Sequence, residues 1–174
     1  LLIGATGFVG SAVLNELVER GHNVTAVVRN VEKIAKNDLV TAVKEDVANV
    51  EAIAKLAEGK DAIISAYNPG WLNPEIATLI TENYPEEIMG GVRPLGDFYL
   101  NTLMNEKNID WVFFSPAGVF DPQGKKTGNY RLGKDDLIVD AEGNSHISVQ
   151  DYADAMVNEL EKPAHHKERF TIGY

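Results

Sequence analysis

The sequence contains no cysteine among its 174 residues, which excludes disulfide bonds, thiolate metal sites and cysteine nucleophiles. Basic residues are also scarce, since 16 lysines and arginines stand against 26 aspartates and glutamates for a formal net charge of −10. Nucleic acids and anionic membranes attract proteins through basic patches, so this balance argues against both as partners. We expect a small-molecule partner instead, and a monomer or homodimer.

Long apolar runs are missing as well. No run approaches the roughly 18 residues that a membrane-spanning helix needs, and no signal peptide is recognisable. Together with the lack of cysteine, this favours a cytoplasmic protein. The chain starts without methionine and its first apolar run is short, which predicts that a few residues precede Leu1. Length and a 44% hydrophobic composition fit one compact domain over residues 1–174.

Short β-branched runs alternate with helical patterns, which is typical of βαβ units. The fold class expected is α/β: a doubly wound parallel sheet between two helical layers. Strands are expected at 1–3, 23–30, 39–46, 61–67, 110–118 and 169–174, and helices after Gly7, at 31–36, 50–58, 74–84 and 96–107. The last two helices follow each other without a strand, so we expect a segment to be missing near Tyr84 and Pro85.

The C-terminal third gives weaker signals. "NYRLG" is interpreted as a turn, and residues 137–148 as a hairpin-like pair turning at 142–144. Ser148 followed by Asp151 predicts the capped start of a helix. The adjacent His165 and His166 are flanked by charge and predict a solvated loop, because a metal site needs further converging ligands. We therefore expect no metal.

The opening "LLIGATGFVG" places glycines at 4, 7 and 10 between a strand and a helix. Such a loop turns the chain sharply, lets a pyrophosphate approach bare backbone, and allows close packing of helix and sheet. The N–H groups and positive dipole end of the following helix then face the anion. The alternative, a purely structural turn, is disfavoured because a strand precedes the loop and an amphipathic helix and a second strand follow it.

The end of the second strand decides which dinucleotide is expected. NAD sites carry an acidic residue there for the ribose hydroxyls, whereas this chain has Arg29 followed by Asn30, which suits a 2′-phosphate. We predict NADP(H) in preference to NAD(H). The alternative is that Arg29 is a solvated charge at a strand end. Asp46 and Val47 end the third strand where an adenine ring would rest, although Asp46 could equally cap a helix.

Two further strands end in small residues. Ser65, Ala66 and Tyr67 follow the fourth strand, and Ser115 and Pro116 follow the strand at 110–118. Ligands of open α/β sheets bind at the carboxyl ends of strands, and small residues there leave room for a nicotinamide. Tyr67 and Ser115 are the candidate catalytic positions, as positioning groups rather than bases.

The motifs "GATGFVG", "VTAVVRN", "SPAGVF" and "ISVQDYADAM" resemble those of the atypical short-chain dehydrogenase/reductase family. The likeness is to its NmrA-like branch of NADH-flavin reductases, similar to biliverdin IXβ (flavin) reductases. It implies a Rossmann-like fold, a nicotinamide dinucleotide and, in some members, hydride transfer to free flavins or quinone-like acceptors. By this likeness the phosphate loop comprises Gly4, Thr6, Gly7, Phe8, Val9 and Gly10, and Arg29 contacts the 2′-phosphate.

One departure from the wider superfamily affects the chemistry. Its classical members carry Tyr-x-x-x-Lys on a helix, where the lysine lowers the pKa of the tyrosine. Here only Tyr130 has a lysine four residues on, Lys134, and that stretch is predicted to be turn and hairpin rather than helix. Direct hydride transfer between stacked rings needs no such pair.

Two functions follow from these observations. The first is an NADPH-dependent reductase of a flat acceptor, with FMN or FAD as a possible substrate. The second is a non-enzymatic NADP(H)-binding redox sensor. A sugar epimerase or dehydratase is disfavoured, because the chain is short for a substrate domain and lacks a convincing tyrosine–lysine pair.

Overall fold

The structure is a computed structural model that describes residues 1–67 and 95–174. The chain divides into two compact units, Leu1–Tyr67 and Asn68–Tyr174, each with its own sheet. The helix expected at 74–84 and the missing segment expected near Tyr84 and Pro85 lie outside the described residues. The expectation of a single domain stays a prediction. No helix within the described ranges is long and apolar enough to cross a membrane.

The first unit is built on a four-stranded parallel sheet. Its strand order is β3-β2-β1-β4, with β1 at Leu2–Ile3, β2 at Val24–Val28, β3 at Val40–Lys44 and β4 at Ile64–Ser65. All three pairings are parallel. These strands lie within the four predicted runs, and order 3-2-1-4 is that of a doubly wound nucleotide-binding half.

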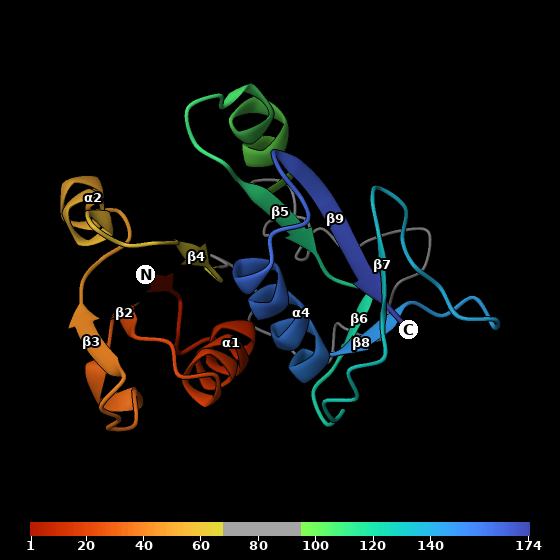
Figure 1. The fold of residues 1–174 in the computed structure, drawn as a ribbon, viewed down its shortest axis with the longest axis horizontal. Helices are drawn as coiled ribbons and strands as arrows, with labels where there is room; N and C mark the ends of the chain where they lie inside the picture. Colours follow the sequence, from red (N-terminus) through yellow and green to blue (C-terminus); the bar gives the residue numbers. More distant parts are fainter. Residues whose placement is uncertain (68–94) are drawn as a thin grey trace. The chain divides into compact units, whose positions relative to one another are not determined.

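Helices cover both faces of this sheet. α1 spans Phe8–Glu19 and α2 spans Val50–Ala57, and Figure 1 shows them on opposite sides of the strands. Val13, Leu14 and Leu17 of α1 are buried, as are Leu2 and Ala26 of the sheet. The short helix expected at 31–36 is a single 3₁₀ turn, η1 at Val31–Lys33. The unit therefore has three layers, as predicted.

The second unit holds a three-stranded sheet of order β5-β9-β7 and a separate pair of β6 and β8. The strands are β5 at Val112–Ser115, β6 at Val119–Asp121, β7 at Arg131–Gly133, β8 at His146–Ser148 and β9 at Glu168–Gly173. β5 and β9 pair in parallel, and β7 pairs antiparallel with β9. The strands predicted at 110–118 and 169–174 are thus confirmed.

Two helical segments flank the sheet of the second unit. α4, at Val149–Glu161, packs Tyr152 onto Phe114 of β5, with the two rings stacked at 4.3 Å. The other face carries the helix at residues 95–101, whose Tyr99 lies 5.0 Å from the Phe113 ring, and this helix is followed by η3 at Leu103–Asn105. Figure 1 shows α4 and the helix at 95–101 on opposite sides of β5 and β9.

Two interpretations of the C-terminal third were wrong. "NYRLG" contains strand β7 rather than only a turn. Residues 137–148 do not form a hairpin: the turn exists, with Asp140 N bonded to Asn144 O at 2.8 Å, but β8 pairs in parallel with β6. Local turn signals cannot reveal a partner strand that lies 27 residues upstream.

A buried carboxylate organises the start of α4. Ser148 caps the helix by accepting from Asp151 N at 3.0 Å, as predicted. The Asp151 side chain is fully buried, and it accepts bonds from Thr127 N and Gly128 N at 2.8 Å and from the Tyr174 hydroxyl. Burial by itself would raise the pKa of this carboxyl, but these bonds outweigh it and hold the pKa below the ordinary value.

We expect Asp151→Asn to lower the free energy of unfolding by about 3 kcal/mol at neutral pH, because a buried, multiply bonded charge is lost. The folded-state pKa of Asp151 is lowered, so its contribution is present above the unfolded value near 4 and disappears as pH falls through the folded value. Urea unfolding at pH 7 and pH 3 should therefore show a smaller difference at pH 3. Asp38→Asn, at an exposed position, is the control and should change neither value.

Candidate dinucleotide-binding site

The predicted cofactor residues of the first unit lie at one edge of its sheet. Ile3 of β1 is in register with Val27 of β2 and with Ser65 of β4, and Val28 is in register with Lys44 of β3. Because all four strands are parallel, their carboxyl ends share this edge. The residues that follow the strands therefore line one side of the unit. They are Gly4 to Gly7, Arg29, Asp46 and Ala66.

Two of the loop glycines are required by the fold. Gly4 has a φ of +84°, and a Cβ there would lie 2.9 Å from the carbonyl oxygen of Ala66. A Cβ on Gly10 would lie 2.1 Å from the carbonyl oxygen of Gly4. Any side chain at either position would collide with backbone, so these glycines let α1 and β4 approach the loop closely.

Gly7 is different, since the fold places little demand on it. Its φ of −79° and ψ of 172° are ordinary extended values, and a Cβ would meet only the Gly4 carbonyl oxygen, at 3.3 Å. Gly7 is nevertheless the N-cap residue of α1, the point where an anion would approach the helix. The missing side chain keeps this approach open, and the site fits a diphosphate here.

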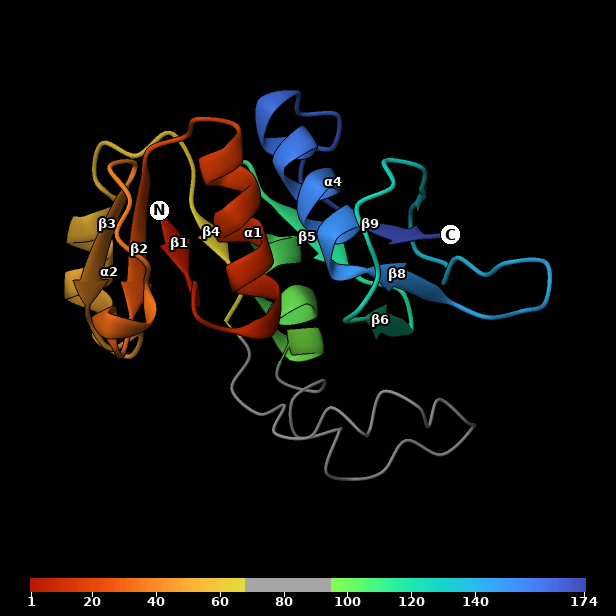
Figure 2. The ribbon, with the colours of Figure 1, turned by 90° about the horizontal axis from the view of Figure 1, so that it is seen from below.

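The electrostatic environment at the start of α1 also favours an anion. No side chain caps the helix, and its first turn contains no acidic residue. The positive end of the helix dipole is therefore not neutralised locally. Figure 2 shows the loop after β1 leading directly into α1. Thr6 is exposed in this loop, Phe8 is 50% exposed, and Val9 is half-buried in the first turn.

Arg29 follows β2 and is exposed to solvent. Its nearest acidic neighbour across the sheet is Glu45, but the Glu45 carboxylate instead accepts from Asp46 N at 2.9 Å and from Asn49 Nδ2 at 3.3 Å. Among the residues that the structure describes, none pairs with the Arg29 guanidinium. The Asn30 side chain caps η1 by accepting from Glu32 N at 3.0 Å, so it is already engaged.

Asp46 is exposed, and one oxygen of its carboxylate accepts from Ala48 N at 2.9 Å. The N-cap of α2 is Asn49 rather than Asp46, so the helix-cap alternative is wrong for Asp46 and a local turn takes its place. Val47 beside it is half-buried. This arrangement leaves the second carboxylate oxygen of Asp46 available for a hydrogen bond.

The remaining candidates stand at strand ends of the two units. Ser65 is the last residue of β4, and Ala66 N donates to Ile3 O at 2.9 Å, which fixes the chain beside Gly4. Tyr67 comes next and is 45% exposed. In the second unit Ser115 ends β5 and is half-buried, and Pro116 follows as an exposed residue. Each candidate thus lies at the carboxyl end of its own strand, as predicted.

Tyr130 and Lys134 do not form a catalytic pair. β7 lies between them, and Lys134 Nζ instead lies 3.7 Å from Glu168 Oε2. The Tyr130 hydroxyl donates to Asp154 Oδ2 at 2.9 Å, and burial together with the Asp154 carboxylate raises the pKa of Tyr130 to about 12. A catalytic tyrosine needs a lowered pKa, so the environment of Tyr130 opposes that role.

The sequence did not reveal the residues of α4 that form hydrogen bonds with the Tyr130 hydroxyl. Asp154 on α4 also pairs with Lys126 Nζ at 2.8 Å, and Asn158 Nδ2 donates to the Tyr130 hydroxyl at 2.8 Å. Asp154 and Tyr130 are 24 residues apart, and no periodic pattern links them. The described residues contain no cluster of three or more potential metal ligands.

Comparisons with known proteins agree with this site. The sequence model of a family described as NAD(P)H-binding matches residues 4–86. The uncharacterized protein YwnB of Bacillus subtilis is 35% identical over 208 residues, covering 98% of this chain and 96% of that protein. That span exceeds the 174 residues of this chain, so the relative contains internal residues with no counterpart here.

Two solved structures are similar over nearly the whole chain. A protein from Bacteroides thetaiotaomicron, provisionally named an epimerase, is 47% identical with a TM-score of 0.89, over 99% of this chain and 95% of that one. A protein from Streptococcus pneumoniae, provisionally named an NADH-flavin reductase, is 31% identical with a TM-score of 0.80, over 99% and 97%. Both likenesses confirm the three-layer α/β fold.

The glycine loop, the uncapped helix start and these relatives agree with one another. The chain belongs to the NAD(P)H-binding atypical short-chain dehydrogenases/reductases, in their NmrA-like branch of nicotinamide-dependent oxidoreductases.

Proposed function

We propose that the protein is an NADPH-dependent reductase that passes hydride directly to a small flat acceptor, either a flavin such as FMN or FAD or a quinone-like ring. The observation that carries this proposal is the loop edge of the first unit. A helix start without cap or acid stands beside an arginine that no described residue pairs with. This combination suits a dinucleotide with one phosphate more than NAD.

The residues at this edge would bind the dinucleotide rather than transfer protons. The loop backbone around Gly7 would hold the diphosphate, Arg29 the 2′-phosphate and Asp46 the adenine amino group. Bound NADPH supplies the hydride. Tyr67 is the candidate of the first unit for positioning the reacting rings, and Ser115 is the separate candidate of the second unit. Solvent would supply any proton, because binding and orientation determine most of the rate of such a reaction.

The name of the Streptococcus pneumoniae relative supports a flavin acceptor, although that name specifies NADH. Arg29 is the residue that favours NADPH over NADH. We continue to predict a cytoplasmic location and a monomeric or homodimeric state. We also predict that neither nucleic acids nor membranes are partners.

A redox sensor that binds NADP(H) without turnover is the second candidate, because no tyrosine–lysine pair exists in the described residues. Purified protein should be mixed with NADPH and each of FMN, FAD and a quinone, and the nicotinamide absorbance followed. Multiple turnovers with any acceptor support the reductase. Tight NADPH binding without turnover across the panel supports the sensor and contradicts our proposal. Turnover of a nucleotide sugar without net redox change would favour the epimerase named for the Bacteroides relative.

If the reductase is active, Tyr130→Phe should leave kcat within about twofold of the wild type, since the hydroxyl is bonded to Asp154 and Asn158. The loss of both hydrogen bonds of the hydroxyl should lower the free energy of unfolding by about 2 kcal/mol. Steady-state kinetics and urea unfolding measure the two effects. A 100-fold loss of kcat with an altered pH profile would show that Tyr130 is the proton donor after all.

A further inference from the structure

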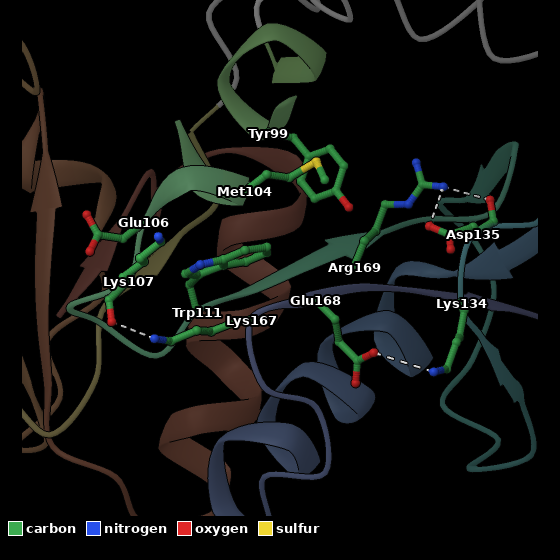
Figure 3. Close-up of a pocket in the computed structure, with 10 residues that line it drawn as sticks. All are labelled: Tyr99, Met104, Glu106, Lys107, Trp111, Lys134, Asp135, Lys167, Glu168 and Arg169. Atoms are coloured by element: carbon green, nitrogen blue, oxygen red, sulfur yellow. Dashed lines mark hydrogen bonds and ion pairs between the residues drawn. The ribbon is translucent and has the colours of Figure 1, made fainter. Parts of the chain in front are cut away.

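The second unit contains a cleft of about 380 Å³. It opens at the amino ends of β5 and β9, whereas Ser115 stands at the carboxyl end of β5. Figure 3 shows Tyr99 and Met104 on one side of it, the Trp111 indole below them and Arg169 beside them. Ligands of α/β sheets normally bind at the carboxyl ends, so the dinucleotide does not account for this cleft.

The aromatic groups of the cleft are organised around Tyr99. Its ring lies 6.1 Å from the Trp111 ring in an edge-to-face arrangement, and the Arg169 guanidinium carbon lies 5.7 Å from the Tyr99 ring centre. Arg169 is in register with Phe113 on the neighbouring strand, which places it on the sheet face that carries Trp111. Trp111 and Arg169 thus lie on the sheet face that the helix of Tyr99 covers, and the Tyr99 ring contacts both.

Two buried donors at this cleft have no acceptor among the residues that the structure describes. Trp111 Nε1 and Arg169 Nε are both shielded from solvent, and neither donates a hydrogen bond to residues 1–67 or 95–174. Indole and guanidinium nitrogens can only donate. A buried polar group without a partner costs free energy, and such groups are rare in folded proteins. We therefore expect both nitrogen atoms to donate hydrogen bonds to an acceptor that is not one of the described residues.

The charges around the cleft favour an anionic acceptor. Lys134 pairs with Glu168 at 3.7 Å, and Arg169 with Asp135 at 3.0 Å. Lys167 Nζ donates to the Lys107 carbonyl oxygen at 2.6 Å, and the Glu106 carboxylate accepts from Asn108 N. Lys107 lines the cleft without an ion pair to any described residue. The lining carries four basic and three acidic side chains, so a positive charge is left over.

We propose that this cleft is a second small-molecule site, which binds an aromatic carboxylate. The carboxylate would accept from Trp111 Nε1 and Arg169 Nε, and the ring would lie against Tyr99 and the exposed Met104. The cleft volume falls within the range of small-ligand sites, about 300 to 1,000 Å³. This site is independent of the hydride chemistry proposed above.

Nitrogen-15 NMR can observe both donors directly. The sequence has two tryptophans, and Trp71→Phe leaves Trp111 as the source of the single indole N–H signal. In the protein saturated with NADPH, benzoate should shift the Trp111 Nε1–H and Arg169 Nε–H signals along one saturable curve. Benzamide, which keeps the ring but loses the charge, should bind at least tenfold more weakly, and acetate should be weaker still.

Variants test which groups bind the probe. Trp111→Phe keeps an aromatic ring without the donor and should raise the benzoate Kd at least fivefold, read from the Arg169 signal. Lys107→Gln should raise it about threefold, and Lys55→Gln on α2 is the matched control with no change. If Trp111→Phe does not fold, the benzoate Kd of Lys107→Gln tests the proposal instead. Linear or unequal shifts, equal binding of benzamide, or displacement of benzoate by NADPH would overturn the proposal.

Discussion

Replacing Gly7 by valine is expected to raise the Kd for NADPH at least 100-fold while the protein stays folded. The φ and ψ of Gly7 are ordinary extended values, and a Cβ there would make one tight contact, 3.3 Å to the Gly4 carbonyl oxygen, which a small shift of the loop can relieve. The side chain would instead occupy the space where a diphosphate approaches the start of α1. A 100-fold loss corresponds to about 2.7 kcal/mol of binding free energy. The loss of a favourable N-cap glycine should cost only about 1 kcal/mol of stability.

Two other glycines provide controls for the Gly7 experiment. Gly10→Ala places a Cβ 2.1 Å from the Gly4 carbonyl oxygen and should cost about 3 kcal/mol of folding free energy. Gly96→Ala adds a Cβ with nothing within 4 Å in the helix at residues 95–101, so it should leave NADPH binding unchanged and raise the free energy of unfolding by up to about 1 kcal/mol. Fluorescence titration with NADPH measures affinity, and urea unfolding measures stability. Unchanged NADPH affinity in folded Gly7→Val would show that the dinucleotide does not bind at this loop.

The second large effect is expected at Arg29. Arg29→Asp should weaken NADPH binding about 100-fold and make NADH the preferred dinucleotide. The guanidinium pairs with no described residue, so no such interaction has to break when NADPH binds. Its charge-assisted hydrogen bonds to a 2′-phosphate would therefore contribute in full to the NADPH affinity. The aspartate would repel that phosphate and accept bonds from the ribose hydroxyls of NADH.

A control with the same change of net charge separates a direct contact between Arg29 and the dinucleotide from the effect of the overall charge of the protein. Lys55→Asp changes the net charge by the same amount at an exposed position on α2, and it should alter both affinities by less than twofold. Parallel titrations with NADPH and NADH at physiological ionic strength measure all four combinations. Wild-type protein that binds NADH as tightly as NADPH would refute the assignment of Arg29 before any variant is made.

The sequence was most informative where chemistry and periodicity are local. Each predicted strand of the first unit contains a real strand, because apolar runs bounded by polar residues fix both length and face. The cap at Ser148 was also predictable, since an N-cap depends on residues within one helical turn. The three glycines could be located from the sequence, but their separate roles could not.

Contacts between distant segments were decided only by tertiary structure. The partner of β8 is β6 rather than the neighbouring residues 137–140, and Tyr130 is bonded to Asp154 on a helix 24 residues later. The same holds for Trp111 and Arg169, which nothing in the sequence brings together. Pairing across a sheet depends on which strands the chain folds back against, and no residue spacing encodes that choice.

By itself, then, the sequence determined a parallel α/β fold, a glycine-rich loop between the first strand and the first helix, and a basic residue at the end of the second strand. These features follow from neighbours along the chain. Only the folded chain showed that a side chain at Gly4 or Gly10 would collide with backbone while one at Gly7 would meet a single carbonyl oxygen, because that distinction depends on where the Gly4 and Ala66 carbonyl oxygens lie. It also showed that Tyr130 is tied into a structural network and that two buried donors lack acceptors among the described residues, since hydrogen-bond satisfaction is a property of three-dimensional neighbours.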